Sequence, residues 1–206
     1  MKVLLLNGSP HVAGTTFRAL SEVARTLNEC GIETEIITVG NKRISGCVAC
    51  KGCVESGVCV RDDKTVKEVA DKISAADGLV IGTPVYYASL NGTLKSLLDR
   101  VFYSGKNFAN KPAAAVAVAR RAGTTATLDI LNKYFMINSM PVVSSQYWNM
   151  VFGRNAEEAE KDEEGMQTMR MLGKNMAWLI KCINSGKENG VNPPEPENHV
   201  RTNFIR

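Results

Sequence analysis

The chain opens with the stretch Lys2-Val3-Leu4-Leu5-Leu6-Asn7-Gly8-Ser9-Pro10, and this stretch decides the fold class. An apolar run of strand type ends there in a loop that is rich in glycine and hydroxyl groups. Apolar residues then recur every three or four positions, the period of a helix that buries one face, at Phe17, Leu20, Val23 and Leu27. The chain therefore begins with a strand, a loop and a helix, which together form one βα repeat.

The same alternation of strand-type and helix-type segments continues along the chain. Such alternation predicts an α/β fold in which helices cover both faces of a parallel sheet. With five strands, we expect a flavodoxin-like doubly wound sheet in the order 2-1-3-4-5. After the first strand, the predicted strands lie at residues 33–39, 79–82, 113–118 and 141–144.

Composition limits the class of protein. The 206 residues are 44% hydrophobic and 22% charged, as in a globular domain and unlike a disordered chain. The net charge of +4 is small and dispersed, so no nucleic-acid partner is expected. Apolar runs of about five residues fall far short of the ~18 that span a bilayer, and no signal peptide is recognisable. We expect a cytoplasmic, membrane-free domain over residues 1–186 and an extended polar tail over residues 187–206.

The loop after the first strand is the first of three candidate ligand-binding loops, because ligands of open α/β sheets bind beyond the carboxyl ends of the strands. Backbone N–H groups at a helix N-terminus, together with hydroxyl groups, suit an anion such as phosphate. The spacing matches neither G-x-G-x-x-G nor G-x-x-x-x-G-K-[ST], which argues against a Rossmann NAD site and a P-loop. The alternative is an ordinary turn capped by Thr15. The candidate residues are Ser9, Pro10, His11, Gly14, Thr15 and Thr16.

The second and third candidate loops follow the predicted third and fourth strands. A Pro-Val-Tyr-Tyr stretch presents backbone amides and an aromatic wall to a planar heterocycle, and paired arginines suit an electron-rich ring edge or a nucleotide phosphate. The alternatives are a packing role for the tyrosines and a solvated surface for the arginines. The candidates are Thr83, Pro84, Val85, Tyr86, Tyr87 and Asn91 in the second loop, and Ala119, Arg120, Arg121 and Gly123 in the third.

Four of the six cysteines lie within thirteen residues, in an irregular segment over residues 44–63 that we expect to be inserted after the second strand. Four thiolates at such short spacing can hold a [4Fe–4S] cluster, and nearby glycines let the loop turn tightly. A structural zinc ion, redox-active thiols without metal and four packed free thiols of purely structural role are the alternatives. The candidate metal ligands are Cys47, Cys50, Cys53 and Cys59.

These motifs resemble a known family. Asn-Gly-Ser-Pro at 7–10 with the later Gly-Thr-Thr, and the run from Thr-Pro-Val-Tyr-Tyr to Leu-Leu-Asp-Arg over 83–100, are similar to the NAD(P)H-dependent FMN reductases. The cysteine run resembles the compact cluster motif of their iron–sulfur flavoprotein branch, and the likeness covers roughly residues 1–183. Two departures stand out: His11 occupies a position where relatives usually carry arginine, and Ala119-Arg120-Arg121 replaces a frequent glycine pair.

The resemblance implies non-covalently bound FMN, with its phosphate at the first loop and its isoalloxazine between the second and third. It also implies a [4Fe–4S] cluster on the four cysteines and a homo-oligomer, either a dimer or, commonly, a tetramer. The tail is outside the likeness, and we expect it either to be solvated or to dock on a neighbouring subunit through Phe204 and Ile205.

The leading functional hypothesis is an FMN-dependent oxidoreductase in which the flavin, and no protein side chain, carries the chemistry. With a cluster, electrons would pass singly between it and the flavin, and the donor would be a ferredoxin-like carrier. Without a cluster, NAD(P)H would reduce the flavin, which would then reduce a quinone or another small acceptor. A non-enzymatic electron carrier and a zinc-stabilised nucleotide-binding module are the alternatives from other classes.

Overall fold

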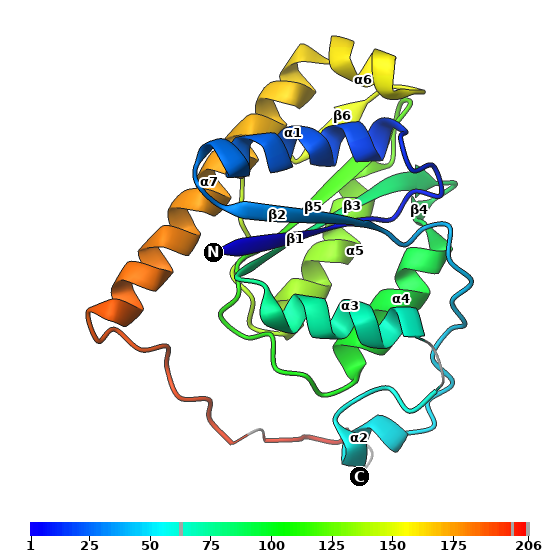
Figure 1. The fold of residues 1–206 in the computed structure, drawn as a ribbon. Coiled ribbons are helices and arrows are strands. Elements are labelled where there is room, and N and C mark those ends of the chain that lie inside the picture. Colours follow the sequence, from blue (N-terminus) through cyan, green and yellow to red (C-terminus); the bar gives the residue numbers. More distant parts are fainter. Residues whose placement is uncertain (62–63, 199, 205–206) are drawn as a thin grey trace.

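The computed structural model describes residues 1–61, 64–198 and 200–204. A mostly parallel sheet lies between two layers of helices (Figure 1). Its strands are β1 (Lys2–Asn7), β2 (Glu33–Thr38), β3 (Gly78–Tyr86), β4 (Ser89–Leu90), β5 (Ala113–Ala119) and β6 (Met150–Phe152). The helices are α1 (Thr15–Glu29), α2 (Gly52–Ser56), α3 (Lys64–Ala75), α4 (Gly92–Tyr103), α5 (Thr124–Ile137), α6 (Ala156–Lys161) and α7 (Glu163–Glu188).

The strand order is β2-β1-β3-β5-β6, with β4 paired antiparallel to β3. The predicted α/β class and flavodoxin-like parallel sheet are confirmed, but the prediction of five strands in the order 2-1-3-4-5 is corrected. The additional strand is β4, because the chain after β3 folds back as a hairpin. The last strand is β6 and not residues 141–144, where Val142 forms an isolated bridge to Ala113. Pro141 has no N–H group, which weakens that segment as a strand.

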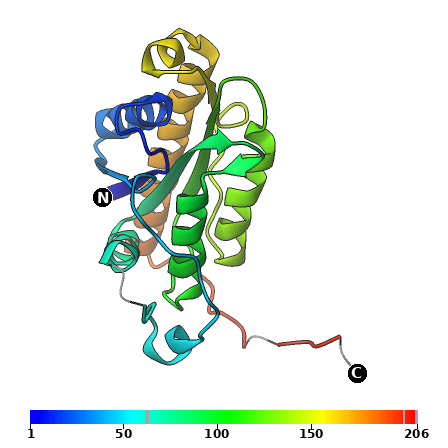
Figure 2. The same ribbon diagram turned by 90° about the vertical axis from the view of Figure 1, so that its right-hand side faces the viewer.

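Side chains of each central strand alternate between two apolar layers, as the two-residue period of a strand requires. Val3 and Leu5 of β1 pack in the layer covered by α1 and α7. Leu4 and Leu6 pack in the layer covered by α3, α4 and α5. Figure 2 shows these helices flanking the sheet, with α2 below it. The helix α2 therefore lies outside the main core, whereas Cys59 of the same segment packs against it.

The carboxyl edge of the sheet is closely packed around the loop that follows β1. The Gly8 N–H donates a hydrogen bond of 2.8 Å to the carbonyl of Gly82 at the neighbouring strand. A Cβ atom on Gly40 would lie 2.1 Å from the Gly8 carbonyl oxygen and 2.4 Å from the Ser9 carbonyl carbon. Only glycine fits at position 40, and its absence of a side chain lets two loops touch through their backbones.

A buried carboxylate joins α1 to α7. Glu22 is 4% exposed and accepts hydrogen bonds from the guanidinium groups of Arg18, Arg25 and Arg170. Burial alone would raise the pKa of Glu22, but the hydrogen bonds from Arg25, Arg170 and Arg18 outweigh it and hold the pKa at about 2. This ion-pair network fixes the position of α1, whose N-terminus lies at the carboxyl edge.

The C-terminal region departs from the sheet after α7. That helix runs to Glu188, and residues 191–198 beyond it form no regular secondary structure. Phe204 is exposed, and Ile205 lies outside the described residues. Among the helices that the structure describes, none is long and apolar enough to cross a bilayer.

Candidate functional site

A pocket of about 720 Å³ lies at the carboxyl edge of the sheet, within the size range of cofactor sites. Four segments contribute to it: the last residues of β3 and the loops that follow β1, β5 and β6. Nine of the predicted site residues lie together on its wall: Ser9, His11, Gly14, Thr15, Thr16, Pro84, Val85, Ala119 and Arg120. The three loops that the sequence singled out therefore meet at one site.

The loop after β1 is held in shape by Asn7, whose side chain is fully buried. Its Oδ1 accepts a hydrogen bond of 3.0 Å from the Ser9 backbone N–H, and its Nδ2 donates to Thr38 Oγ1 at 3.2 Å. Ser9 Oγ in turn accepts a hydrogen bond of 3.1 Å from the backbone N–H of His11. Asn7 was not among the predicted site residues, although its place at the end of a buried strand is a signal of this role.

The N-terminus of α1 faces the pocket without a side-chain cap. Gly14 occupies the capping position in an extended conformation, and among the described residues no side chain accepts from the first N–H groups. Thr15, the expected cap in the alternative interpretation, instead donates its hydroxyl to the carbonyl of Gly153 at 3.3 Å. The first-turn N–H groups of α1 are consequently directed toward the pocket with no side-chain acceptor, as in helices that bind anions.

The remaining predicted residues of the second and third loops support the wall or lie outside it. Buried Thr83 accepts a hydrogen bond of 3.2 Å from the backbone N–H of Asn91, and Asn91 caps α4. Gly123 has a φ of 90° and packs against Val85, where a Cβ atom would lie 2.8 Å from Val85 Cγ1. These three residues position the pocket and do not line it.

Four other predicted residues are not on the pocket wall: Pro10, Tyr86, Tyr87 and Arg121. Tyr86 and Tyr87 lie at the β3–β4 turn, and both rings are exposed. Tyr87 has a φ of 52°, a left-handed backbone conformation that is uncommon for an aromatic residue. The aromatic wall expected from the sequence is therefore turned toward solvent in this structure.

The sequence reasoning missed the fourth segment of the pocket. This loop follows β6 and contributes Gly153, Arg154, Asn155 and Ala156. It was missed because the last strand was assigned to residues 141–144, ahead of the true strand end. Arg154 donates to Glu158 at 2.8 Å, and these hydrogen bonds hold the pKa of Glu158 at about 2.

The four cysteines of the motif all line one small cavity of about 20 Å³. Cys47 and Cys50 are exposed, whereas Cys53 and Cys59 are half-buried. Across the described chain, no three Cys, His, Asp or Glu side chains approach one another as the ligands of one metal ion would. Four thiols around one cavity match the donor set of an iron–sulfur cluster, and in this arrangement they do not form a single-ion site.

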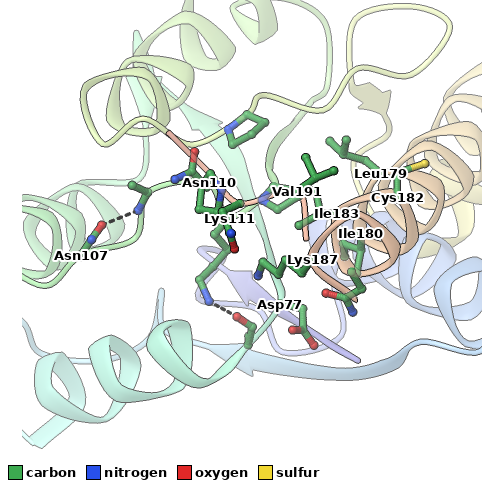
Figure 3. Close-up of a pocket in the computed structure, with 18 of the residues that line it drawn as sticks. Asp77, Asn107, Asn110, Lys111, Leu179, Ile180, Cys182, Ile183, Lys187 and Val191 are labelled. Atoms are coloured by element: carbon green, nitrogen blue, oxygen red, sulfur yellow. Dashed lines mark hydrogen bonds between the residues drawn. The ribbon is translucent and has the colours of Figure 1, made fainter. Parts of the chain in front are cut away.

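Another cavity, of about 750 Å³, opens at the opposite edge of the sheet, near the C-terminal end of α7 (Figure 3). Some of its polar groups bind one another: the Lys111 ammonium donates to the carbonyls of Ser74 and Ala76, and Asn107 Oδ1 accepts from the Ala109 N–H. Burial lowers the pKa of Lys111. Because these groups already have partners, the carboxyl-edge pocket is the better cofactor candidate.

The carboxyl-edge pocket fits FMN. The uncapped start of α1 suits a phosphate group, and Arg120 and Arg154 add positive charge to the same wall. Val85 and Val118 provide an apolar surface on which a planar ring can pack.

Comparison with known proteins agrees with this assignment. Residues 1–155 match the family described as NADPH-dependent FMN reductase. An iron–sulfur flavoprotein of Methanocaldococcus jannaschii is 35% identical over 193 residues, covering 89% of this chain and 99% of the relative. One from Methanosarcina thermophila is 31% identical over 194 residues, covering 91% and 100%.

The fold also matches solved structures. The crystal structure of RosB with a bound riboflavin-5'-phosphate derivative superposes with a TM-score of 0.72, at 16% identity, and covers 100% of this chain and 94% of that one. This likeness supports the fold alone. From its sequence relatives, the chain belongs to the NADPH-dependent FMN reductase family, in the iron–sulfur flavoprotein branch, and is a flavin-dependent oxidoreductase.

Proposed function

We propose that the carboxyl-edge pocket binds FMN and that the chain passes electrons from a reduced donor to a small acceptor. The donor would be a ferredoxin-like carrier or NAD(P)H. The observation that carries this proposal is the convergence of three loops and the end of β3 on one pocket, with the uncapped start of α1 and two arginines on its wall. When bound, FMN supplies the redox chemistry, since it accepts electrons in pairs from a hydride donor or singly from a metal centre.

The protein residues then bind and orient the cofactor. Because Ser9 Oγ accepts from the His11 N–H, the Ser9 hydroxyl hydrogen is free to donate to a phosphate oxygen. The first-turn N–H groups of α1 donate to the same phosphate. Val85, which also contacts Gly123, packs against the flavin ring. The exposed Tyr86 and Tyr87 lie next to Val85 in the chain and are available to contact a substrate or a redox partner.

We further propose that Cys47, Cys50, Cys53 and Cys59 hold a [4Fe–4S] cluster that exchanges single electrons with FMN. What supports the cluster is the shared cavity of the four thiols and the family branch. The cavity lies on a loop outside the sheet, so we propose that the cluster serves the flavin of a neighbouring subunit in a homo-oligomer. An NAD(P)H-dependent FMN or quinone reductase without a cluster is the second candidate, favoured by the match of residues 1–155 to the NADPH-dependent FMN reductase family.

The test is made on protein purified without oxygen, in which flavin, iron and acid-labile sulfide are counted per chain. We expect about one FMN with about four irons and four sulfides per chain. Flavin without iron, together with turnover of NADH or NADPH, would favour the second candidate. No flavin after reconstitution with FMN would refute both.

The arginine pair provides a matched test of the pocket. Arg120 lies on the wall, whereas Arg121, its neighbour in sequence, does not. Loss of one charge-assisted contact corresponds to about 1.4 kcal/mol, or about tenfold in affinity. We expect Arg120→Ala to weaken FMN or NADPH binding about tenfold and Arg121→Ala to leave both within twofold, measured by flavin fluorescence and by the KM for NADPH. Equal effects of the two substitutions would contradict the assigned wall.

A further inference from the structure

Arg100 is a buried cation on the last turn of α4 that neither the sheet nor the carboxyl-edge pocket uses. It is 2% exposed. Its guanidinium points into the cysteine-bearing segment and donates to three of the residues that the structure describes there. Nε donates to Cys59 Sγ at 3.3 Å, Nη1 donates to the Ser45 carbonyl at 3.3 Å, and Nη2 donates to the Arg61 carbonyl at 3.3 Å.

Two of these acceptors lie at the two ends of the cysteine motif in the sequence. Ser45 lies two residues before Cys47, and Arg61 lies two residues after Cys59. One side chain therefore holds both ends of the cysteine motif and its fourth cysteine. Tyr103, one turn further along α4, adds a contact, since its carbonyl accepts from Cys53 Sγ at 3.7 Å.

An arginine suits this task better than any other residue. Its planar guanidinium carries five N–H donors in a fixed arrangement, so it can bind several acceptors at once. Bringing the ends of a flexible loop together costs conformational entropy, and bonds to both ends offset that cost. The exposed Cys47 and Cys50 lie within the part of the loop that Arg100 closes.

We infer that Arg100 is the positioning residue of the cysteine loop. It holds Ser45 and Arg61 together, so that the four thiols face one cavity before any metal group is bound, and it directs an N–H group at the sulfur of Cys59. The inference rests on the proposed function in one respect only, that the loop holds a metal group. Closure of the loop by Arg100 can be measured without that group.

The first experiment uses the metal-free chain with FMN bound, and the rate at which iodoacetamide alkylates each cysteine is followed by mass spectrometry. We expect Cys59 to react more slowly than Cys47 in the unmodified chain, and Arg100→Gln to accelerate Cys59 at least tenfold. Lys95→Gln is the matched control, because Lys95 lies on the same helix in an exposed ion pair with Asp99. It should leave every rate unchanged.

The second experiment titrates the metal-free chain with ferrous iron and sulfide without oxygen, and follows the thiolate-to-iron charge-transfer absorption. Loss of a residue that orients metal ligands typically weakens binding 10–100-fold, and we expect a loss in that range for Arg100→Gln. Arg100→Lys keeps the charge but offers fewer directed donors, so it should recover part of the affinity. After reconstitution with iron and sulfide, the reduction potential should be lower in Arg100→Lys, because hydrogen bonds to sulfur tune the potential. A purely structural role would leave that potential unchanged.

The outcomes separate this inference from the proposed function. Normal protection of Cys59 and normal affinity for iron and sulfide in Arg100→Gln that still binds FMN would overturn the inference. If the unmodified chain takes up no metal but Arg100→Gln still exposes Cys59, the cluster proposal fails and the inference stands. If Arg100→Gln misfolds and loses FMN, the alkylation rates of Arg100→Lys and of the unmodified chain are used instead. In the unmodified chain, a Cys59 that reacts as fast as Cys47 would overturn the inference.

Discussion

The carboxyl-edge pocket and the cysteine loop are built in different ways. The pocket stands on the ends of buried strands, and backbone contacts as close as that between Gly40 and Gly8 lock its loops together. The cysteine loop, over residues 45–61, lies outside the sheet, and a single buried side chain, Arg100, bonds both of its ends. A site on strand ends is in place before its ligand arrives, whereas a site on a loop depends on a few contacts and on the group it binds.

The largest expected effect comes from a substitution at Gly40, which would disrupt the backbone contact between two loops of the pocket. A methyl group at position 40 would lie 2.1 Å from the Gly8 carbonyl oxygen, and because that atom belongs to the backbone, the loop itself must move. We expect Gly40→Ala to destabilise the fold by more than about 3 kcal/mol and to abolish FMN binding. Urea unfolding and FMN fluorescence titration measure the two effects.

Gly46 provides the control in the other region. It precedes the first cysteine of the motif, and a Cβ atom there would meet no atom of the described residues within 4 Å. Gly46→Ala should therefore change stability by less than about 0.5 kcal/mol and leave FMN binding unchanged. Similar losses in the two variants would show that the pocket is no more rigid than the loop.

The next effect removes the metal group and leaves the pocket intact. Cys50 is exposed, so its thiol contributes little to packing. We expect Cys50→Ser to lose most of its iron and sulfide while it binds FMN as the unmodified chain does, measured by metal analysis and flavin absorbance. Cys182→Ser, at an exposed cysteine outside the motif, should keep its iron. Full iron content in Cys50→Ser would contradict the assigned ligand set.

A smaller effect tests the support of α1 behind the pocket. Loss of the Glu22 charge weakens three charge-assisted hydrogen bonds, and we expect Glu22→Gln to cost about 2 kcal/mol. The pKa of Glu22 is about 2 in the folded chain against an ordinary 4.5, so its contribution is complete above pH 4.5 and is lost as pH falls toward 2.

Acid unfolding measures this contribution. Between pH 4.5 and 2 the stability of Glu22→Gln should fall less steeply than that of the unmodified chain. Equal slopes in the two chains would assign the acid sensitivity to other carboxylates. Glu160→Gln is a suitable control, since Glu160 pairs with Arg18 at an exposed position.

The sequence predicts a region well when local patterns build it and poorly when long-range contacts build it. The pocket loops after β1, β3 and β5 could be predicted, because a strand period and a glycine-rich loop are local patterns. The loop with Arg154 could not, because β6 is three residues long and an earlier Val-Val pair resembles a strand better. The role of Arg100 in positioning the cysteine loop could not be predicted either, because its partners lie 39–55 residues away in the chain. Long-range contacts of this kind leave no periodic signal.

The smallest effect concerns α4, the helix that connects the two regions. Asn91 caps its start by accepting from the Leu94 N–H at 3.1 Å, and Arg100 stands nine residues later, roughly 13 Å along the axis. We expect Asn91→Ala to cost about 1 kcal/mol, or about 2–4 °C in Tm, with Asn91→Asp as the control that keeps the acceptor. Fraying is confined to the first turn, so FMN affinity should fall less than tenfold and the alkylation rate of Cys59 should stay unchanged. If Cys59 is exposed as well, α4 transmits the loss from one region to the other, and the pocket and the loop are then parts of one cooperative unit.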